Sequence, residues 1–330
     1  MISESKKFYK NKIILITGGT GSFGSSFIKF VIQKKIQLKK LIILSRDEYK
    51  QHNLLIKYPE NKYDFLRFYL GDIRDEERLV SVMKDVDYVI NAAALKHVYK
   101  AEYDPIEFIK TNVNGVQNII SASLKNKVKK VITLSTDKAC EPFNLYGATK
   151  LCAEKLLLAA NNIKGENKTY FTVVRYGNVF NSRGSIVPKL LSLKNKNVIK
   201  ISNSKMTRFS MMMDEAIEMV NWSIINCNGK EIVVPKLKSY RLIDLVKAVA
   251  PKCKIINEGK KIGEKIHEKL ISNQETENIF FNGKYYLILN ESKPRLKIKN
   301  FKKVYLNEYS SKENTYLSIN EIRDKISSIK

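Results

Sequence analysis

Short apolar runs alternate with amphipathic stretches through the first half of the chain. The runs at 12–17, 41–44 and 130–135 are rich in Val, Ile and Leu, as buried parallel strands are. Between such runs, apolar residues recur at helical spacing, as they do at 25–35. This alternation predicts repeated βα units and an α/β fold with a doubly wound parallel sheet. The remaining strands are expected at 65–70, 87–91 and 170–175, and the remaining helices at 74–84, 105–125 and 146–160.

The pattern is looser after about residue 181. Three later segments keep helical periodicity, at 186–193, 214–225 and 242–250. Short apolar runs lie at 232–234 and 285–289, whereas the Lys-rich segment 252–269 predicts a loop. We therefore expect residues 1–180 to form a cofactor-binding domain that carries the catalytic residues. Residues 181–330 are then mainly a smaller C-terminal α/β substrate-binding domain, interleaved with the first.

A glycine-rich segment, GGTGSFG at 18–24, follows the first predicted strand and opens the first helix. Gly18 suits a tight turn, Gly21 lets backbone N–H groups approach a pyrophosphate, and Gly24 lets helix and strand pack closely. The positive end of the helix dipole would face the phosphates. A plain strand–helix turn can share this composition, but the position favours a Rossmann-type dinucleotide site. The loop residues expected to bind the dinucleotide are Gly18, Thr20, Gly21, Ser22, Phe23 and Gly24.

The residues after the second predicted strand bear on the choice between NAD and NADP. A carboxylate at this place binds the adenosine ribose of NAD, whereas a cation binds the 2′-phosphate of NADP. The chain has both, because Ser45 is followed by Arg46 and Asp47. Arg46 comes first after the apolar run, so we expect NADP, with NAD as the less favoured cofactor. Further contacts expected after the third and fourth strands are Asp72, Ile73, Ala92 and Ala93.

Tyr146 and Lys150 lie four residues apart, on one face of a predicted helix. This spacing suits an acid–base pair in which Lys150 lowers the pKa of Tyr146 and reaches the nicotinamide ribose. Tyr146 would then take a hydroxyl proton while hydride leaves the substrate. A surface pair has the same spacing, so the glycine-rich segment in the same chain is what favours the catalytic interpretation.

These motifs together resemble the extended short-chain dehydrogenase/reductase superfamily. Within it, the resemblance is closest to the inverting UDP-N-acetylglucosamine 4,6-dehydratases. It spans residues 12–210 and continues weakly to 263–268. The motifs that carry it are TGGTGSFG (17–24), SRDE (45–48), GDIRD (71–75), NAAALKHV (91–98), KTNVNG (110–115), LSTDKA (134–139), NLYGATK (144–150), VRYGNV (174–179), SRGS (182–185) and MTRF (206–209).

The segment 136–138, Thr-Asp-Lys, distinguishes between branches of this superfamily. Retaining dehydratases carry an Asp-Glu pair here and 4-epimerases lack the Asp–Lys pair, so the resemblance implies an inverting dehydratase. Lys138 would remove the C5 proton of a 4-keto sugar, once desolvation has deprotonated its ammonium group. Protonated Asp137 would donate to the departing 6-hydroxyl. The catalytic residues expected are Thr136, Asp137, Lys138, Tyr146 and Lys150.

The resemblance also implies two sets of binding residues. Those expected near the cofactor, besides the ones named above, are Ser45, Arg46, Asp47, Glu48, Lys50, Lys96, Thr111, Tyr146, Lys150 and Val179. Those expected at the substrate are Lys96, Asn178, Arg183, Thr207, Arg208, Lys261 and Glu264. Arg183 and Arg208 can pair with a diphosphate in a bidentate way. Lys261 stands where the family usually has Arg, and Ser210 where relatives commonly have Trp, so we expect the nucleotide and sugar contacts there to differ from those of the family.

The expected reaction product is a UDP-2-acetamido-2,6-dideoxy-L-hexos-4-ulose, for glycan or pseudaminic-acid-type sugar synthesis. A UDP-sugar 4-epimerase and a non-inverting 4,6-dehydratase remain alternatives. More distant ones are a non-catalytic NADP-binding regulator and a nucleic-acid binder. The family resembled commonly forms dimers or hexamers, so a homo-oligomer is expected.

The composition bounds the partners of the protein. The chain of 330 residues has 59 Lys+Arg against 33 Asp+Glu, a formal charge of +26. The excess is mostly Lys, scattered and not clustered with aromatic residues, so we expect a solvated surface and no nucleic acid as partner. No window approaches the roughly 18–20 uncharged apolar residues of a membrane span, and no apolar stretch precedes Ile13.

The cysteines and histidines add no metal site to this picture. The four cysteines are widely spaced and lack a Cys-x-x-Cys pair. No His, Cys or carboxylate cluster has the spacing of metal ligands. We therefore expect a cytoplasmic, reduced enzyme without a metal ion.

Overall fold

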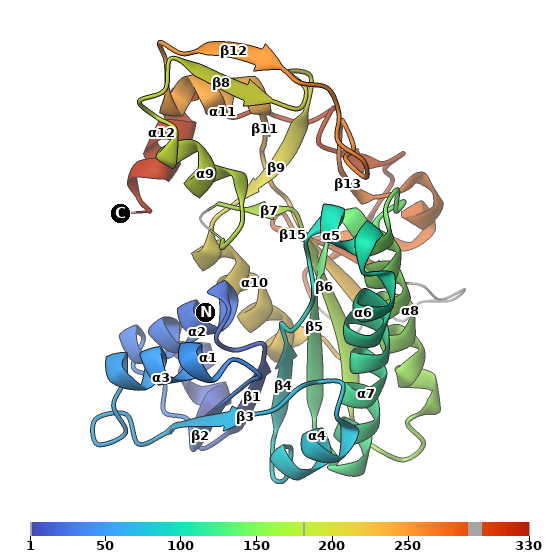
Figure 1. Cartoon of the computed structure of the whole chain (residues 1–330). Coiled ribbons are helices and arrows are strands. Elements are labelled where there is room, and N and C mark those ends of the chain that lie inside the picture. Colours follow the sequence, from blue (N-terminus) through green and yellow to red (C-terminus); the bar gives the residue numbers. More distant parts are fainter. Residues whose placement is uncertain (1, 181, 290–298, 330) are drawn as a thin grey trace.

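The computed structural model describes residues 2–180, 182–289 and 299–329. Its centre is a large twisted β-sheet (Figure 1). The strands are β1 (Ile13–Thr17), β2 (Lys40–Ser45), β3 (Leu66–Leu70), β4 (Tyr88–Asn91), β5 (Lys130–Thr136), β6 (Tyr170–Tyr176), β10 (Glu231–Pro235), β14 (Ile279–Phe281), β15 (Tyr285–Leu289) and β16 (Lys302–Val304). Within the described residues these ten strands have the order β3-β2-β1-β4-β5-β6-β10-β15-β14-β16.

The strands from β3 to β10 are parallel, and β15, β14 and β16 extend the sheet through antiparallel pairs. The order β3-β2-β1-β4-β5-β6 confirms the predicted Rossmann-type, doubly wound sheet. Strands β10, β14, β15 and β16 come from the second half of the chain. They complete a sheet that the first half begins.

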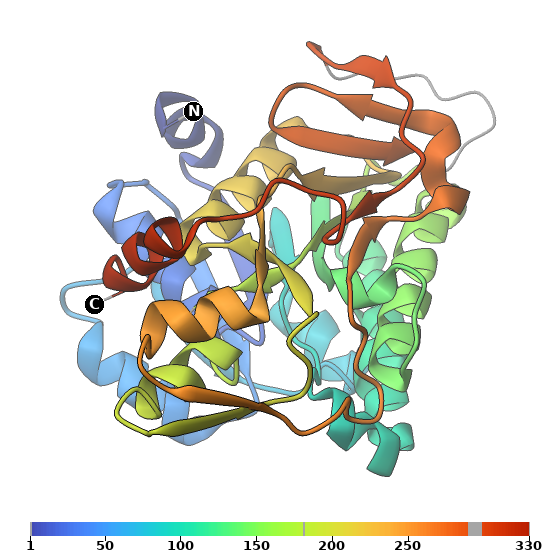
Figure 2. The same cartoon turned by 90° about the horizontal axis from the view of Figure 1, so that it is seen from above.

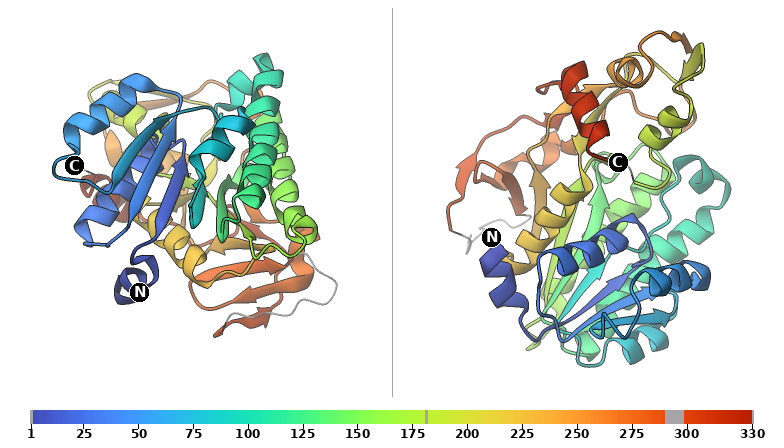
Figure 3. Two further views of the ribbon diagram at one scale, coloured as in Figure 1. Left: turned by 90° about the horizontal axis from the view of Figure 1, so that it is seen from below. Right: turned by 90° about the vertical axis from the view of Figure 1, so that its left-hand side faces the viewer.

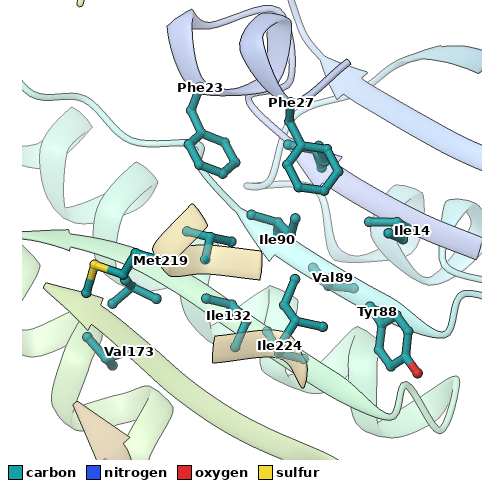
Figure 4. Packing of buried hydrophobic residues seen from close by; sticks show 14 of the residues in the cluster. Ile14, Phe23, Phe27, Tyr88, Val89, Ile90, Ile132, Val173, Met219 and Ile224 are labelled. Atoms are coloured by element: carbon teal, nitrogen blue, oxygen red, sulfur yellow. The ribbon is translucent and has the colours of Figure 1, made fainter. Parts of the chain in front are cut away.

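Helices cover both faces of this sheet (Figure 3). On one face lie α4 (Glu76–Val82), α7 (Gly115–Lys125) and α8 (Leu145–Ile163), and α7 contacts both of the others. On the other face α2 (Ser22–Gln33) packs against α10 (Met213–Asn226). Figure 4 shows Phe27 of α2 and Ile224 of α10 near Ile90 and Ile132 of the central strands. Because both faces are covered, the strands β1 and β4 are buried along their whole length.

A smaller unit lies at one end of the sheet (Figures 1 and 2). It contains the parallel pair β8 (Val198–Ile201) and β12 (Lys254–Asn257), with helices α9 (Ile186–Ser192), α11 (Leu242–Val249) and α12 (Ile319–Ser327). Its apolar core is separate from the main one and includes Leu190, Tyr240, Leu245 and Ile322. The short strands β7 (Asn178–Val179), β9 (Thr207–Met211) and β11 (Ser239–Arg241) form a further sheet, and β13 (Lys269–Ile271) pairs with β17 (Tyr309–Ser310).

Two expectations about individual elements are wrong. The segment 252–269 contains β12, whose residues are mostly exposed, so no apolar run marks the strand. The segment 105–125 is not one α-helix, because a π-helical turn at Lys110–Asn114 separates α6 (Pro105–Ile109) from α7. The other helices are α1 (Ile2–Tyr9), α3 (Glu48–Lys57) and α5 (Val98–Tyr103), and 3₁₀ turns cover Asp137–Ala139 and Asn273–Asn278.

The π-helical turn is held by the side chain of Asn112. Its Oδ1 accepts a hydrogen bond from the Leu95 backbone N–H at 2.9 Å. Its Nδ2 donates to the Leu95 carbonyl at 2.9 Å and to Thr149 Oγ1 at 3.1 Å. Turns of this kind are rare and occur often at functional sites. This one ties the loop after β4 to α8, and it carries Thr111 to the cleft described below.

A buried ion-pair cluster joins the second half of the chain to α8. The fully buried Arg175 donates to both carboxylate oxygens of Glu154, at 3.0 and 2.6 Å. It also donates to both oxygens of Glu275, at 2.9 and 2.8 Å, and to the Leu270 carbonyl at 3.0 Å. The cluster therefore fixes the segment around β13 against the helix that carries Tyr146.

We expect Arg175→Met to lower the free energy of unfolding by about 3–5 kcal/mol, because it leaves the buried Glu154 and the partly buried Glu275 without their cation. Urea unfolding followed by circular dichroism measures the change. Lys125→Met is the control, since Lys125 pairs with Glu76 at the surface and such pairs contribute at most about 1 kcal/mol. A similar small change in both variants would contradict a structural role for the cluster.

Candidate active site

A cleft of about 690 Å³ lies where the parallel strands end. Its walls come from the segments after β1, β2, β4, β5 and β6, together with residues 182–185. In doubly wound sheets this edge is where ligands bind, because the loops diverge there and leave a crevice. The strand order therefore brings the sequence motifs of the first half into one place.

The glycine-rich segment forms the floor of the cleft. Gly18 has φ +62°, and a Cβ atom there would lie 2.8 Å from the Ala93 Cα, so only glycine fits. Helix α2 begins at Ser22 with Gly21 as its N-cap, and no side chain caps it. The positive end of its dipole is thus open toward the cleft. The N-terminus of α2 has no side-chain cap, and the glycines leave the backbone N–H groups accessible. Both features suit the binding of the pyrophosphate of a dinucleotide.

The end of β2 forms the part of the cleft next to this floor. Thr20 Oγ1 and Ser45 Oγ are hydrogen-bonded at 2.8 Å. The Arg46 side chain is 54% exposed, and its Nη1 lies 3.5 Å from Asp72 Oδ2. The Asp47 carboxylate accepts from the Lys50 backbone N–H at 2.9 Å and pairs with the Lys50 ammonium group, and these bonds hold its pKa below the usual range. Asp47 is therefore engaged in capping α3, whereas Arg46 is accessible.

Five polar atoms of residues that line the cleft are buried and have no hydrogen-bond partner within the described residues. They are Thr111 Oγ1, Ser135 Oγ, Asp137 Oδ2, Asn178 Oδ1 and Ser185 Oγ. Buried polar atoms are almost always paired in proteins, so such atoms need a bound molecule or water as partner. Their common location fits a site that binds a polar ligand.

Lys138 follows β5 directly, in the 3₁₀ turn. Thr136 Oγ1 accepts from the Lys138 backbone N–H at 3.4 Å and donates to Asp137 Oδ1 at 3.0 Å. Lys138 Nζ lies 3.0 Å from Asp137 Oδ1 and 3.3 Å from Glu268 Oε1. A Cβ atom on Gly147 would lie 2.2 Å from the Lys138 carbonyl oxygen, so a glycine here lets α8 pack directly on this turn. The Asp–Lys pair is therefore held rigidly beside Tyr146.

The ionisation of Lys138 differs from the expectation. Burial alone would lower its pKa, as predicted from the sequence, but the charges of Asp137 and Glu268 outweigh burial and raise the pKa above the usual range. Lys138 is therefore an ammonium group in this structure, and desolvation does not deprotonate it. The sequence alone did not reveal that a second carboxylate faces this side chain.

Tyr146 and Lys150 lie on the buried face of α8, as predicted. Lys150 Nζ donates to the Leu134 carbonyl at 2.7 Å, and burial lowers the pKa of Lys150 to about 8. Burial raises the pKa of Tyr146 to about 12, against the lowering effect of the Lys138 charge and the Thr136 hydroxyl. The cation that lowers the pKa of Tyr146 in this structure is Lys138, and the effect expected of Lys150 on this pKa stays a prediction.

Most of the residues expected at the cofactor line the cleft. They are Gly18, Thr20, Gly21, Ser22, Phe23, Ser45, Arg46, Asp47, Lys50, Asp72, Ile73, Ala92, Ala93, Lys96, Thr111, Tyr146, Lys150 and Val179. Gly24 lies outside, where a Cβ atom would meet the Gly19 backbone at 2.1 Å. Glu48 is also outside, exposed in the first turn of α3. The catalytic set of Thr136, Asp137, Lys138, Tyr146 and Lys150 is brought together in the same cleft.

Only some of the residues expected at the substrate line the cleft. Lys96, Asn178 and Arg183 line the cleft. Arg183 lies on the glycine-rich segment, because its Nη1 donates to the Thr20 carbonyl at 3.1 Å and its backbone N–H to Ser22 Oγ at 3.0 Å. Lys96 Nζ donates to the Arg183 carbonyl at 2.6 Å. In this structure the Arg183 guanidinium group is therefore placed for the phosphates nearest the glycine loop.

The other expected substrate residues are Thr207, Arg208, Lys261 and Glu264, and they do not line the cleft among the residues described. Arg208 donates to the carbonyls of Thr207, Ile266 and Lys265, at 2.7, 3.0 and 3.0 Å. Its donors are in use, so the bidentate diphosphate contact expected of it is not formed in this arrangement. Glu264 Oε2 accepts from the Lys261 backbone N–H at 3.1 Å, within its own loop.

Several polar side chains at or next to the cleft were not predicted as site residues, and the three largest of them are His97, Tyr176 and Glu268. His97 is the N-cap of α5, and Tyr176 ends β6; both line the cleft. Glu268 is buried and lies beside Lys138. His97 and Glu268 fall within the segments 91–98 and 263–268 and Tyr176 within 174–179, so the motifs contained them without revealing their contacts.

Within the described ranges no group of three or more His, Cys, Asp or Glu side chains is placed to hold a metal ion. None of the helices described has the length and apolar character needed to cross a membrane.

A family model and several curated relatives match this chain over most of its length. Residues 14–290 match the model of the family described as polysaccharide biosynthesis protein. The UDP-N-acetylglucosamine 4,6-dehydratase (inverting) of Campylobacter jejuni is 47% identical over 284 residues, which is 85% of this chain and 83% of that protein. The UDP-glucose 4-epimerase of Rickettsia canadensis is 37% identical over 328 residues, which is 96% and 95% of the two chains.

A solved structure supports the same grouping. The crystal structure of Pen from Bacillus thuringiensis superposes with a TM-score of 0.90 at 35% identity, over 98% of this chain and 99% of that one. The motifs, the strand order and these similarities agree. The chain belongs to the polysaccharide biosynthesis protein family, within the extended short-chain dehydrogenase/reductase superfamily.

Proposed function

We propose that the protein is an NADP-dependent UDP-N-acetylglucosamine 4,6-dehydratase that inverts C5. The observation that carries this proposal is the Asp137–Lys138 pair, 3.0 Å apart, in one cleft with Tyr146 and Lys150. An acid and a base side by side suit removal of water across C5 and C6. The 47% identity to the inverting enzyme of C. jejuni supports the same reaction.

Different residues of the chain would bind the cofactor and transfer protons. A bound nicotinamide dinucleotide would supply the acceptor for the C4 hydride and later return that hydride to C6. The glycine-rich segment and Arg183 would bind its pyrophosphate, and Lys150 the nicotinamide ribose. Tyr146 Oη takes the 4-hydroxyl proton, and the Lys138 charge and Thr136 hydroxyl favour the phenolate that this step requires.

Asp137 and Lys138 then carry out the elimination. The proton on Lys138 Nζ passes to Asp137 Oδ1, 3.0 Å away, which produces a neutral amine and a carboxylic acid in one step. Lys138 Nζ takes the C5 proton, acidified by the 4-keto group, while Asp137 donates its proton to the departing 6-hydroxyl and water leaves. Once the hydride has returned to C6, C5 would take a proton from a water molecule on the opposite face, and the proton held by Tyr146 would return to that water. These transfers restore the charges of the three side chains and give the L-configured 4-keto sugar.

The test is incubation of the protein with UDP-N-acetylglucosamine and NADP⁺ in D₂O, with the product identified by mass spectrometry and proton NMR. We expect a 4-keto-6-deoxy sugar with deuterium at C5 and inverted configuration there. A 4-keto sugar of D configuration would instead identify a non-inverting dehydratase. A 4-epimer that keeps its 6-hydroxyl would overturn both dehydratase assignments.

A UDP-sugar 4-epimerase is the second candidate, favoured by the similarity to the Rickettsia enzymes over nearly the whole chain. Epimerisation needs the Tyr146–Lys150 pair and the cofactor, but no acid for the 6-hydroxyl and no base for C5. The buried Asp137–Lys138 pair would then have no chemical task, although burying a charged pair is costly. The product analysis in D₂O separates the two functions directly.

The preference for NADP rests on Arg46, and Arg46→Ala tests it. We expect the Kd of NADP⁺ to rise about tenfold and that of NAD⁺ to change little, because one charged hydrogen bond to the 2′-phosphate is lost. Isothermal titration with each nucleotide measures the two constants. Lys57→Ala removes an exposed cation from the far end of α3, the helix that follows Arg46, and is the matched control. An equal rise in the Kd of both nucleotides would show that Arg46 does not bind the 2′-phosphate.

Other expectations stay predictions. They are the domain division at residue 180, a homo-oligomeric assembly, a cytoplasmic location and a role in pseudaminic-acid-type synthesis.

A further inference from the structure

Glu268 is a buried carboxylate outside the predicted catalytic set. It precedes β13 and is 1% exposed. Its backbone N–H donates to Ser311 Oγ at 2.9 Å, and its carbonyl accepts from the Ser311 backbone N–H at 2.8 Å. Ser311 Oγ is hydrogen-bonded in turn to Thr207 Oγ1 at 2.8 Å. Ser311 therefore holds the backbone of Glu268 at both its N–H and its carbonyl group.

The carboxylate of Glu268 faces the Lys138 ammonium group. Its Oε1 lies 3.3 Å from Lys138 Nζ and 3.8 Å from Arg208 Nε, and its Oε2 is buried without a hydrogen-bond partner among the described residues. Asp137 approaches the same ammonium group from the 3₁₀ turn, at 3.0 Å. Lys138 is thus held between two carboxylates that come from distant parts of the chain.

The remaining groups around Lys138 are one cation and two phenols. The Arg208 charge opposes the ammonium form, whereas Asp137 and Glu268 favour it. The Lys138 charge acts in turn on the phenols of Tyr146 and Tyr240. Two buried carboxylates and two cations therefore balance one another, and removal of either carboxylate leaves an excess of positive charge.

We propose that Glu268 is a positioning residue of the dehydratase, which acts through Lys138 by orienting its Nζ and setting the pH at which it becomes a base. This inference rests on the proposed function. In the elimination, Asp137 becomes neutral when it accepts the Lys138 proton, so it no longer holds the lysine by charge. Glu268 remains charged at that moment and keeps Nζ in place, and it stabilises the ammonium group that forms again when the C5 proton arrives.

The experiment compares pH–rate profiles of dehydration for the wild-type protein and Glu268→Gln. Loss of the negative charge disfavours the ammonium form, so the Lys138 pKa falls. We expect the limb of the profile that reports loss of the Lys138 proton to move to lower pH by about one unit or more. Glu277→Gln is the matched control, because it removes an equal but exposed charge from the 3₁₀ turn at Asn273–Asn278, and its limb is expected to coincide with the wild type.

A purely structural role would lower kcat without moving the limb, and that result would overturn the inference. Thermal unfolding shows whether each variant is folded. If Glu268→Gln does not fold, Glu268→Asp is the variant that tests the inference. It keeps the negative charge but moves the carboxylate away from Lys138 by the length of one methylene group. We expect a smaller shift in the same direction for Glu268→Asp, and an unchanged limb would again overturn the inference. Failure of the wild-type protein to dehydrate UDP-N-acetylglucosamine would instead refute the proposed function.

Discussion

Lys138→Ala is expected to abolish dehydration, with kcat lowered by at least about a thousandfold, because the variant has no base for the C5 proton. Lys138 Nζ is the basic group beside Asp137 in the cleft, 3.0 Å from its Oδ1. Binding of the dinucleotide is expected to persist, since the glycine-rich segment and Lys150 are unchanged. Mass spectrometry of the product and titration with NADP⁺ measure the two properties.

The step that fails in this variant can be identified. Tyr146 and the cofactor remain, so C4 oxidation is expected to proceed, but more slowly, because the Lys138 charge no longer favours the Tyr146 phenolate. The absorbance of reduced nicotinamide is therefore expected to rise slowly on addition of the sugar. No deuterium enters at C5 in D₂O, because proton removal there needs Lys138. Thermal unfolding is measured alongside, because Asp137 and Glu268 stay buried without the ammonium group between them. If Lys138→Ala turned over at the wild-type rate, Lys138 would not be the base for the C5 proton.

Tyr146→Phe is expected to lower kcat by roughly a thousandfold, because it removes the acceptor of the 4-hydroxyl proton. The substitution deletes one buried oxygen and keeps the ring, so the packing of α8 is retained. Tyr146 takes part in C4 oxidation, the step that precedes the elimination by Lys138. We therefore expect neither reduced nicotinamide nor exchange at C5, in contrast to Lys138→Ala, and absorbance and NMR distinguish the two variants.

The matched control for this variant is Tyr103→Phe, since Tyr103 is an exposed phenol on α5. Its kcat is expected to equal that of the wild type. If Tyr146→Phe still formed reduced nicotinamide at the wild-type rate, another group would be the base for the 4-hydroxyl. The assignment of Tyr146 would then be wrong.

The strands of the doubly wound sheet were predictable because they are buried on both faces. Such strands are continuous apolar runs, as β1 and β4 show, and helices with one apolar stripe separate them. The glycine-rich segment was equally predictable, because the positive φ of Gly18 and its approach to Ala93 leave glycine as the only choice. Exposed elements such as β12 were missed, since solvent on one side weakens the apolar signal.

The π-helical turn at Lys110–Asn114 was missed for a different reason. It depends on the hydrogen bonds of Asn112 to Leu95 and Thr149, which are made by the folded chain and not by local preference. Arg183 shows the same limit. Its sequence motif marked it as a phosphate-binding residue, but its contact with the Thr20 carbonyl decides which part of the cleft it faces.

The sequence by itself determined which chemical groups the site contains: the glycine-rich segment, the Asp137–Lys138 pair, and Tyr146 and Lys150 one helical turn apart. Local spacing was sufficient for the glycine-rich segment and for the Tyr146–Lys150 pair, because each lies on a single turn or helix face, whereas the Asp137–Lys138 pair followed from the family resemblance of its motif. Only the tertiary structure decided the charge of Lys138, which depends on Glu268 as well as on Asp137. The physical reason is that a pKa follows from all charges and burial within a few ångströms, and the fold brings these together from distant parts of the chain.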